Sequence, residues 1–156
     1  MPVIVFGGSY GGMLAAWLRM KYPHVFLGAF ASSAPILYFR NSPDATLEAY
    51  NDIITKDYAD NNPDIPALAK EGWGYILNAD PTQYDGISTL FKTCAQISKT
   101  DDLKNLYTHL VNGYAYMSMT DYPYDSNFLM HMPPFPVKAA SQYFNGIAPL
   151  ANQNST

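Results

Sequence analysis

The architecture of this chain is set near its start, where the sequence reads Val3-Ile4-Val5-Phe6-Gly7-Gly8-Ser9-Tyr10-Gly11-Gly12-Met13-Leu14-Ala15-Ala16-Trp17-Leu18. Four β-prone apolar residues come first, and a glycine-rich turn and a run of good helix formers follow. This order predicts a short strand buried on both faces, a tight turn, and a helix to about Lys21 that Pro23 ends. Residues 25–34 predict a second strand, parallel to the first through a right-handed connection.

The turn contains Gly7-x-Ser9-x-Gly11, the nucleophile-elbow pattern. In this pattern the serine lies at the apex of a strained turn with its hydroxyl exposed. We expect Gly7 and Gly11 to let strand and helix pass closely, because neither has a Cβ. The helix amides behind Ser9 would favour a tetrahedral oxyanion. The alternative is a structural turn that binds phosphate at most, although the dinucleotide and P-loop glycine patterns are both absent from the sequence.

The composition excludes several function classes. The chain has 156 residues, one domain's length, of which 48% are hydrophobic and 14% charged, as in globular proteins. A net charge of −4 argues against nucleic acid as a partner. No apolar run reaches the roughly 18 residues of a membrane span, and no secretory signal opens the sequence.

The helical patterns that follow predict an insertion into the α/β core. They cover residues 44–58, 67–77, 84–91 and 101–117, with Asp44 as the N-cap of the first. A last short helix is expected at 137–144, after a proline-rich stretch that returns the chain to the core. An elbow strand needs neighbours on both sides, and only one more strand is clear, so we expect an internal fragment or a truncated gene product. The expected domains are a partial core (1–40), an all-helical cap (41–134) and an incomplete return to the core (135–156).

Two blocks of sequence resemble the family of lysosomal Pro-X carboxypeptidase and dipeptidyl peptidase II. The first comprises residues 7–17, Arg19-Met20-Lys21-Tyr22-Pro23-His24 and Ala31-Ser32-Ser33-Ala34-Pro35-Ile36. The second comprises Asp121-Tyr122-Pro123-Tyr124, Asn127-Phe128-Leu129 and Pro134-Phe135-Pro136-Val137-Lys138. The blocks bracket most of the chain, and the part between them matches only loosely.

The resemblance implies an α/β-hydrolase fold and a serine exopeptidase that cleaves next to proline. Ser9 would form an acyl-enzyme, and the backbone N–H of Tyr10 would be an oxyanion donor. No cofactor or metal is implied, and the substrate would be a peptide with proline near the scissile bond. The resemblance also implies a lysosomal or secreted location and suggests a homodimer. Whether the enzyme is a carboxypeptidase or a dipeptidyl peptidase stays open.

The sequence offers no clear partner for a catalytic serine, which needs a histidine base and an orienting carboxylate. His24 is expected to be structural, because it lies about 20 Å from Ser9 by helical rise. His109 is expected to face solvent in mid-helix, and His131, in a loop, could overhang the cleft but is a weak candidate. The resemblance implies that the catalytic Asp and His lie beyond the matched region, so we expect the isolated chain to be a very poor catalyst.

Two further residues are candidates for substrate binding. Met13 lies one helical turn beyond Ser9 and could line the substrate pocket; the alternative is core packing. Asp121 could bind a substrate's amino terminus. The alternative for Asp121 is a structural turn at a helix end, held by hydrogen bonds of Tyr122 and Tyr124.

Cys94 is the chain's one cysteine and is expected to be a small buried hydrophobe. It resembles a cysteine of the family's cap disulfides, but the chain offers it no partner. Asn154-Ser155-Thr156 forms an N-glycosylation sequon.

Two other functions stay open at this point. One is an esterase or lipase of the same fold, against which the block at residues 121–124 argues. The other is a non-catalytic truncated product that keeps Ser9 and acts as a binding module.

Overall fold

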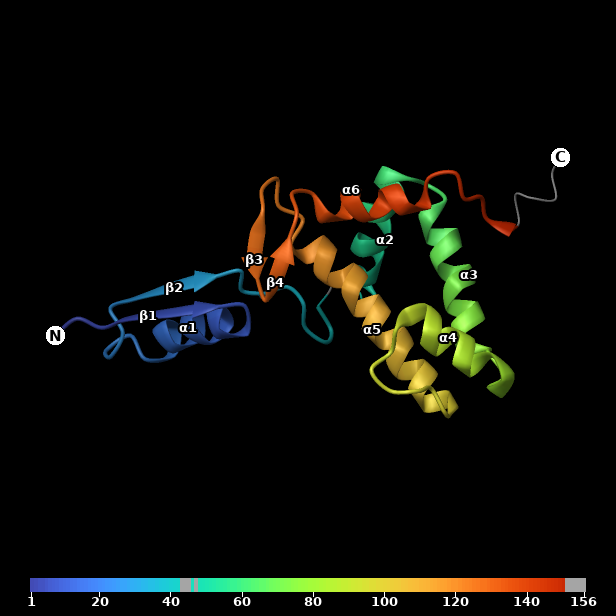
Figure 1. Cartoon of the computed structure of the whole chain (residues 1–156). Coiled ribbons are helices and arrows are strands. Elements are labelled where there is room, and N and C mark those ends of the chain that lie inside the picture. Colours follow the sequence, from blue (N-terminus) through green and yellow to red (C-terminus); the bar gives the residue numbers. More distant parts are fainter. Residues whose placement is uncertain (43–45, 47, 151–156) are drawn as a thin grey trace. The chain divides into compact units, whose positions relative to one another are not determined.

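The computed structural model describes residues 1–42, 46 and 48–150, which divide into two compact units, Met1–Ala49 and Tyr50–Thr156 (Figure 1). The first unit contains β1 (Ile4–Gly8), α1 (Tyr10–Lys21) and β2 (Gly28–Ser32). Elements of the remaining chain are α2 (Ala49–Asn61), α3 (Ile65–Leu77), η1 (Pro81–Gln83), α4 (Tyr84–Phe91), α5 (Thr100–Met119), β3 (Ser126–Phe128), β4 (Met130–Met132), α6 (Pro136–Ser141) and η2 (Gln142–Phe144). We refer to residues 1–49 as the elbow unit and to the rest as the helical unit.

In the elbow unit, β1 and β2 are parallel and α1 packs against both strands. The register runs from Ile4 opposite Gly28 to Gly8 opposite Ser32. The predicted strand–turn–helix–strand order and the helix end at Lys21 are therefore confirmed. The second strand is shorter than expected, because the chain turns at Tyr22, whose carbonyl oxygen accepts hydrogen bonds from the backbone N–H groups of Val25 and Phe26.

The prediction of a strand buried on both faces is wrong for this structure. Ile4 is 54% exposed and Phe6 is 71% exposed. The ring of Phe6 stacks on that of Phe30, with the ring centroids 5.6 Å apart. The physical reason is that β1 pairs with one strand among the described residues and α1 packs against the resulting two-stranded sheet, which leaves these side chains uncovered.

Four of the five predicted helices are described in full. The predicted helix 84–91 is confirmed with the same bounds as α4, and α5 extends the predicted 101–117 by a few residues at its ends. Helix α3 begins at Ile65 rather than residue 67, since Pro66 suits the first turn of a helix. The last predicted helix is divided into α6 and the single turn η2. Helix α2 begins at Ala49, and the proposed N-cap Asp44 lies outside the described residues.

Two apolar clusters form the core of the helical unit. One comprises Ile76, Tyr84, Ile87, Ile97 and Leu103. The other comprises Tyr58, Ile65 and Val137, and it packs α6 against α2 and α3. Val137 is 1% exposed, so α6 is anchored among these helices. The predicted domain boundaries and the return to the hydrolase core stay predictions.

The segment between α5 and α6 forms a hairpin that the sequence analysis assigned to a loop. Strands β3 and β4 pair antiparallel, with Asn127 opposite His131. Leu129 alone connects them, with a φ of 65°. His131 therefore lies in a strand, which corrects its predicted loop position.

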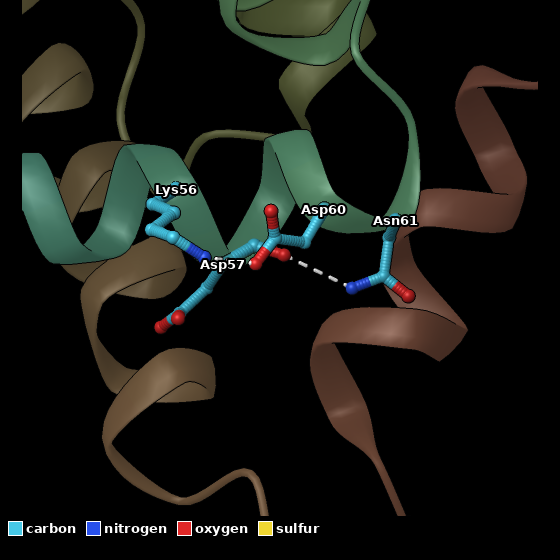
Figure 2. Close-up of polar contacts among 4 residues, drawn as sticks. All are labelled: Lys56, Asp57, Asp60 and Asn61. Atoms are coloured by element: carbon cyan, nitrogen blue, oxygen red, sulfur yellow. Dashed lines mark hydrogen bonds and ion pairs between the residues drawn. The ribbon is translucent and has the colours of Figure 1, made fainter.

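The end of helix α2 is closed by side-chain contacts (Figure 2). Lys56 forms an ion pair with Asp60 one turn further on, and the hydrogen bond from Lys56 to this carboxylate raises the lysine pKa. The side-chain amide of Asn61 donates to the carbonyl oxygen of Asp57 at 3.0 Å. This bond adds a side-chain contact to the last turn of the helix.

Candidate active site

Ser9 occupies a strained position between β1 and α1. Its backbone has φ 55° and ψ −123°, a combination that non-glycine residues rarely adopt, and its side chain is exposed. Three hydrogen bonds hold this conformation. The N–H of Ser9 donates to Ser32 O at 3.0 Å, and Ser9 O accepts from the N–H of Gly12 at 2.9 Å and of Met13 at 3.3 Å. The strain and the exposed hydroxyl are the features that the elbow pattern predicts.

Two glycines make this turn sterically feasible, and one of them differs from the prediction. A Cβ on Gly7 would lie 2.0 Å from the carbonyl oxygen of Gly11, and one on Gly12 would lie 2.7 Å from Ser32 O. A Cβ on Gly11 would meet nothing within 4 Å. The predicted close approach of strand and helix is therefore confirmed at Gly7, which meets the backbone of Gly11, but Gly11 itself does not need to lack a Cβ. The second crowded glycine is Gly12, because it faces the carbonyl oxygen of Ser32 at the end of β2.

The N-terminus of α1 is open toward the serine. Tyr10 is the first helical residue, so its N–H has no acceptor within the helix. No side chain caps this end, and the first turn carries no acidic residue. The amide dipoles therefore favour negative charge beside the Ser9 hydroxyl. Such charge would develop on the oxygen of an attacked carbonyl group.

The histidines lie as follows. His24 is exposed just beyond the end of α1, with its ring edge-on to that of Tyr22 at 6.3 Å. His109 is exposed on α5, which confirms the prediction that it faces solvent, and His131 is exposed on β4. Among the described residues, no histidine or carboxylate forms a hydrogen bond with the Ser9 hydroxyl.

Comparison with known proteins identifies the family. The family model described as Serine carboxypeptidase S28 matches residues 1–152. The chain belongs to the serine carboxypeptidase S28 family. It is 40% identical over 144 residues to a lysosomal Pro-X carboxypeptidase from Bos taurus, covering 91% of this chain and 28% of that protein. Identity to the Homo sapiens protein of that name is 36%, with the same coverage. Identity to a thymus-specific serine protease from Mus musculus is 46% over 112 residues, which is 67% of this chain and 21% of that protein.

This S28 chain thus spans about a quarter of the length of the curated relatives that it matches. The S28 family is of α/β-hydrolase type, and the parallel strands and elbow helix of residues 1–49 are compatible with that class. Membership in a serine carboxypeptidase family also favours a peptidase over the esterase or lipase alternative.

Met13 in the S28 chain is 3% exposed. It lies on α1, which packs against β1 and β2, so core packing accounts for its burial. A role for Met13 in lining a substrate pocket stays a prediction.

Asp121 follows α5 and contacts the start of α6. Its Oδ1 accepts a hydrogen bond from the N–H of Val137 at 3.2 Å, and Tyr122 O accepts one from the N–H of Phe135 at 2.8 Å. The rings of Tyr122 and Tyr124 stack at 5.4 Å. The geometry supports the structural alternative. The turn is held by the Asp121 carboxylate and the Tyr122 carbonyl oxygen, and among the described residues no hydrogen bond of the Tyr122 or Tyr124 hydroxyl contributes. Substrate binding by Asp121 stays a prediction.

Cys94 in the S28 chain is exposed, so the prediction of a small buried hydrophobe is wrong. Lys92 ends α4 in the left-handed conformation, and the connection to α5 buries Ile97 in place of the cysteine. The N–H of Ile97 donates to the Ser88 hydroxyl at 2.9 Å, which fixes this loop. The sequon at residues 154–156 lies outside the described residues.

The part of the chain that the structure describes, residues 1–42, 46 and 48–150, shows neither a metal-binding cluster nor a membrane-spanning helix. This part of the chain holds no group of three or more His, Cys, Asp or Glu residues arranged to bind a metal ion. None of its helices is long and apolar enough to cross a bilayer.

The sequence analysis missed two residues that support Ser9. One is Ser32, whose carbonyl oxygen anchors the Ser9 N–H, and the other is Gly12. A signal existed for Ser32, because the carboxyl ends of paired parallel strands meet at one edge of the sheet. The Gly11-Gly12 doublet was visible too, but the motif alone does not say which glycine is crowded.

Proposed function

We propose that Ser9 is the nucleophile of a serine exopeptidase. The observation that carries this proposal is the backbone of Ser9, held at φ 55° with its hydroxyl exposed at the N-terminus of α1. Membership in the S28 family supports it. The Ser9 oxygen would attack a peptide carbonyl, the Tyr10 N–H would stabilise the oxyanion, and water would then hydrolyse the acyl-enzyme.

The proposed substrate is a peptide with proline beside the scissile bond and a free carboxyl end. Relatives named lysosomal Pro-X carboxypeptidase support both features, and they support a lysosomal location. Their name favours carboxypeptidase over dipeptidyl peptidase action. A homodimer stays a prediction.

A working serine peptidase also needs a base that reaches the serine hydroxyl. We propose that the base and its carboxylate come from parts of a longer protein, since this chain covers 28% of the bovine relative and brings no such group to Ser9 among its described residues. The 156-residue chain alone would then turn over substrate very slowly. Subtilisin, the reference case, loses about 10⁶-fold in turnover without its histidine.

The test compares the 156-residue chain with a longer protein that carries it, each as wild type and Ser9→Ala. A fluorophosphonate probe labels only activated serines, so we expect labelling of the longer wild-type protein and loss of it in Ser9→Ala. Ser42→Ala serves as the matched control and should be labelled normally. Prolyl peptides with free or amidated carboxyl ends, and an ester substrate, define the specificity.

Three results would contradict the proposal. Labelling that persists in Ser9→Ala places the nucleophile elsewhere. Ester hydrolysis without peptide hydrolysis favours an esterase. Absence of labelling in a folded longer protein favours the non-catalytic binding module.

A further inference from the structure

A hollow of about 360 Å³ lies between α2, α3 and α5. Its walls include Ile54 and Tyr58 of α2, Ala69 of α3 and Val111 of α5. All of its lining residues belong to the helical unit. None of them belongs to the elbow unit that carries Ser9. Its volume falls at the lower end of the roughly 300–1,000 Å³ that small-molecule sites occupy.

The aromatic part of this wall is built around Trp73. Its ring meets those of Tyr107 and Tyr114 edge-to-face, with centroids 5.6 Å away in each case. The ring of Tyr114 also lies 4.9 Å from that of Tyr58, whose hydroxyl donates to the Tyr114 carbonyl oxygen at 3.4 Å. Rings that hold one another in this way form a preformed surface for a flat apolar group.

The hollow has one formal charge, Lys70. No other lining residue is a lysine, arginine, aspartate or glutamate. Burial raises the pKa of Tyr58 and of Tyr114, so both phenols are neutral at pH 7. The next residue, Glu71, accepts hydrogen bonds from the Leu150 N–H at 3.0 and 3.2 Å.

Lys70 itself is exposed and forms no ion pair in the part of the chain that the structure describes. Its ammonium group is thus available to a ligand. A cation would be repelled by this lysine, whereas an anion bound over the rings would gain a charge-assisted contact.

We propose that this hollow binds a small carboxylate that carries an aromatic ring, such as the C-terminal residue of a peptide. The ring lies against Trp73 and Tyr107, and the carboxylate pairs with Lys70. The hollow is open to solvent, so the rest of a peptide can leave it without a clash.

The experiment uses the full 156-residue chain with Trp17→Phe, which leaves Trp73 as the sole tryptophan. N-acetyl-L-phenylalanine, its amide, and the acetylated peptide Ala-Ala-Phe with a free carboxyl end are titrated while the Trp73 fluorescence is followed. We expect saturable binding of the acid at roughly millimolar concentration. The amide should bind about three- to fivefold more weakly, since an exposed ion pair is worth little. If the peptide acid binds as tightly as N-acetyl-L-phenylalanine, the natural ligand is the end of a peptide chain. If it binds more weakly, the natural ligand is a free small acid.

Two matched pairs of variants locate the site. Lys70→Met should abolish the preference for acid over amide, whereas Lys138→Met, at an exposed lysine on α6, should keep it. Ala69→Phe fills the hollow and should weaken both ligands by about tenfold or more. Ala67→Phe, at an exposed position of α3, should not. Circular dichroism shows whether each variant is folded.

The proposal is overturned if a folded chain shows no saturation by the acid. It is also overturned if acid and amide bind equally, or if Ala69→Phe binds as tightly as Ala67→Phe. None of these results bears on fluorophosphonate labelling of Ser9, so the two proposals fail separately.

Discussion

The backbone N–H of Ser9 donates a hydrogen bond of 3.0 Å to the carbonyl oxygen of Ser32. Gly8 and Ser32 are the last paired residues of β1 and β2, so this bond continues the ladder one residue beyond the strand. The sheet itself therefore holds the strained φ of Ser9. The elbow conformation should depend on every group that lets β1, α1 and β2 approach one another.

Gly7→Ala should loosen the elbow unit. Its Cβ would lie 2.0 Å from the carbonyl oxygen of Gly11, and backbone must move to relieve such a contact. We expect amide hydrogen exchange in β1 and α1 to be at least about tenfold faster. Gly8→Ala is the control, because its Cβ meets nothing within 4 Å. Similar exchange in both variants would contradict the packing described above.

Gly11→Ala and Gly12→Ala should have opposite effects on stability. Alanine at Gly11 fits and lowers the entropy of the unfolded chain, which should stabilise the elbow unit by about 0.4–1 kcal/mol. Alanine at Gly12 would press on Ser32 O at 2.7 Å and should destabilise it by about 1–3 kcal/mol. Urea unfolding, followed by Trp17 fluorescence with Trp73→Phe, measures both. The same sign for the two changes would refute the assignment of the crowded glycine.

Ser88→Ala should destabilise the helical unit. The Ser88 hydroxyl is buried and accepts the only described hydrogen bond of the Ile97 N–H, at 2.9 Å. Leaving that N–H unpaired should lower the free energy of unfolding by about 1–3 kcal/mol. Thr89→Ala, at an exposed position on the same helix, is the control for helix propensity. Urea unfolding of the two variants provides the comparison, and equal losses would show that the loop finds another acceptor.

Asp102 should make the start of α5 sensitive to acid. Its carboxylate accepts from the Ser98 N–H and hydroxyl and from the Lys99 N–H, and the bonds from Ser98 lower the pKa of the carboxyl group. Because the folded pKa is below the unfolded value of about 3.9, this stabilisation is present above that pH and is lost as the pH falls through the folded pKa. Asp102→Asn should reduce the melting temperature at pH 7 and change it little near pH 2.

The matched control for Asp102 is Asp101→Asn. Asp101 pairs with Lys104 at 3.1 Å across one exposed turn, a contact worth about 0.3–0.5 kcal/mol. Its melting temperature at pH 7 should therefore differ little from that of the unaltered chain. If Asp102→Asn and Asp101→Asn behave alike at pH 7, the capping role of Asp102 is wrong.

Asp121→Ala should weaken the attachment of α6. It removes the acceptor of the Val137 N–H, and we expect a loss of about 0.5–2 kcal/mol, as for a helix cap. Asp121→Asn keeps an acceptor oxygen and should lose less. Amide exchange at Val137 reports the effect directly. Unchanged exchange, together with weaker binding of substrates that have a free amino end, would instead favour the substrate-binding hypothesis.

Local patterns predicted most of the helices and the elbow. The strand at residues 4–8, the helix that follows it and helix 84–91 all have strong periodicity or breakers at their ends. These signals lie within a few residues of one another, so a single sequence is enough to find them. The family resemblance rested on the elbow region and on a second block at residues 121–138, and the family is confirmed.

Other features depend on contacts that sequence spacing does not encode. The crowding at Gly12 comes from Ser32, twenty positions later, and the burial of Ile97 in place of Cys94 comes from Ser88. The β3–β4 hairpin was missed because Leu129 turns it with a positive φ, which leucine rarely adopts. The roles of Met13 and Asp121 in substrate binding depend on groups outside their own packing, and they stay predictions.

The exposed thiol of Cys94 gives the chain a single chemical handle. With one cysteine in the whole sequence, a maleimide dye attaches at one defined place, the loop between α4 and α5. A dye at this position reports on the helical unit alone, next to the loop that the hydrogen bond between the Ile97 N–H and the Ser88 hydroxyl fixes. The fluorescence anisotropy of that dye would then follow the mobility of this loop in solution.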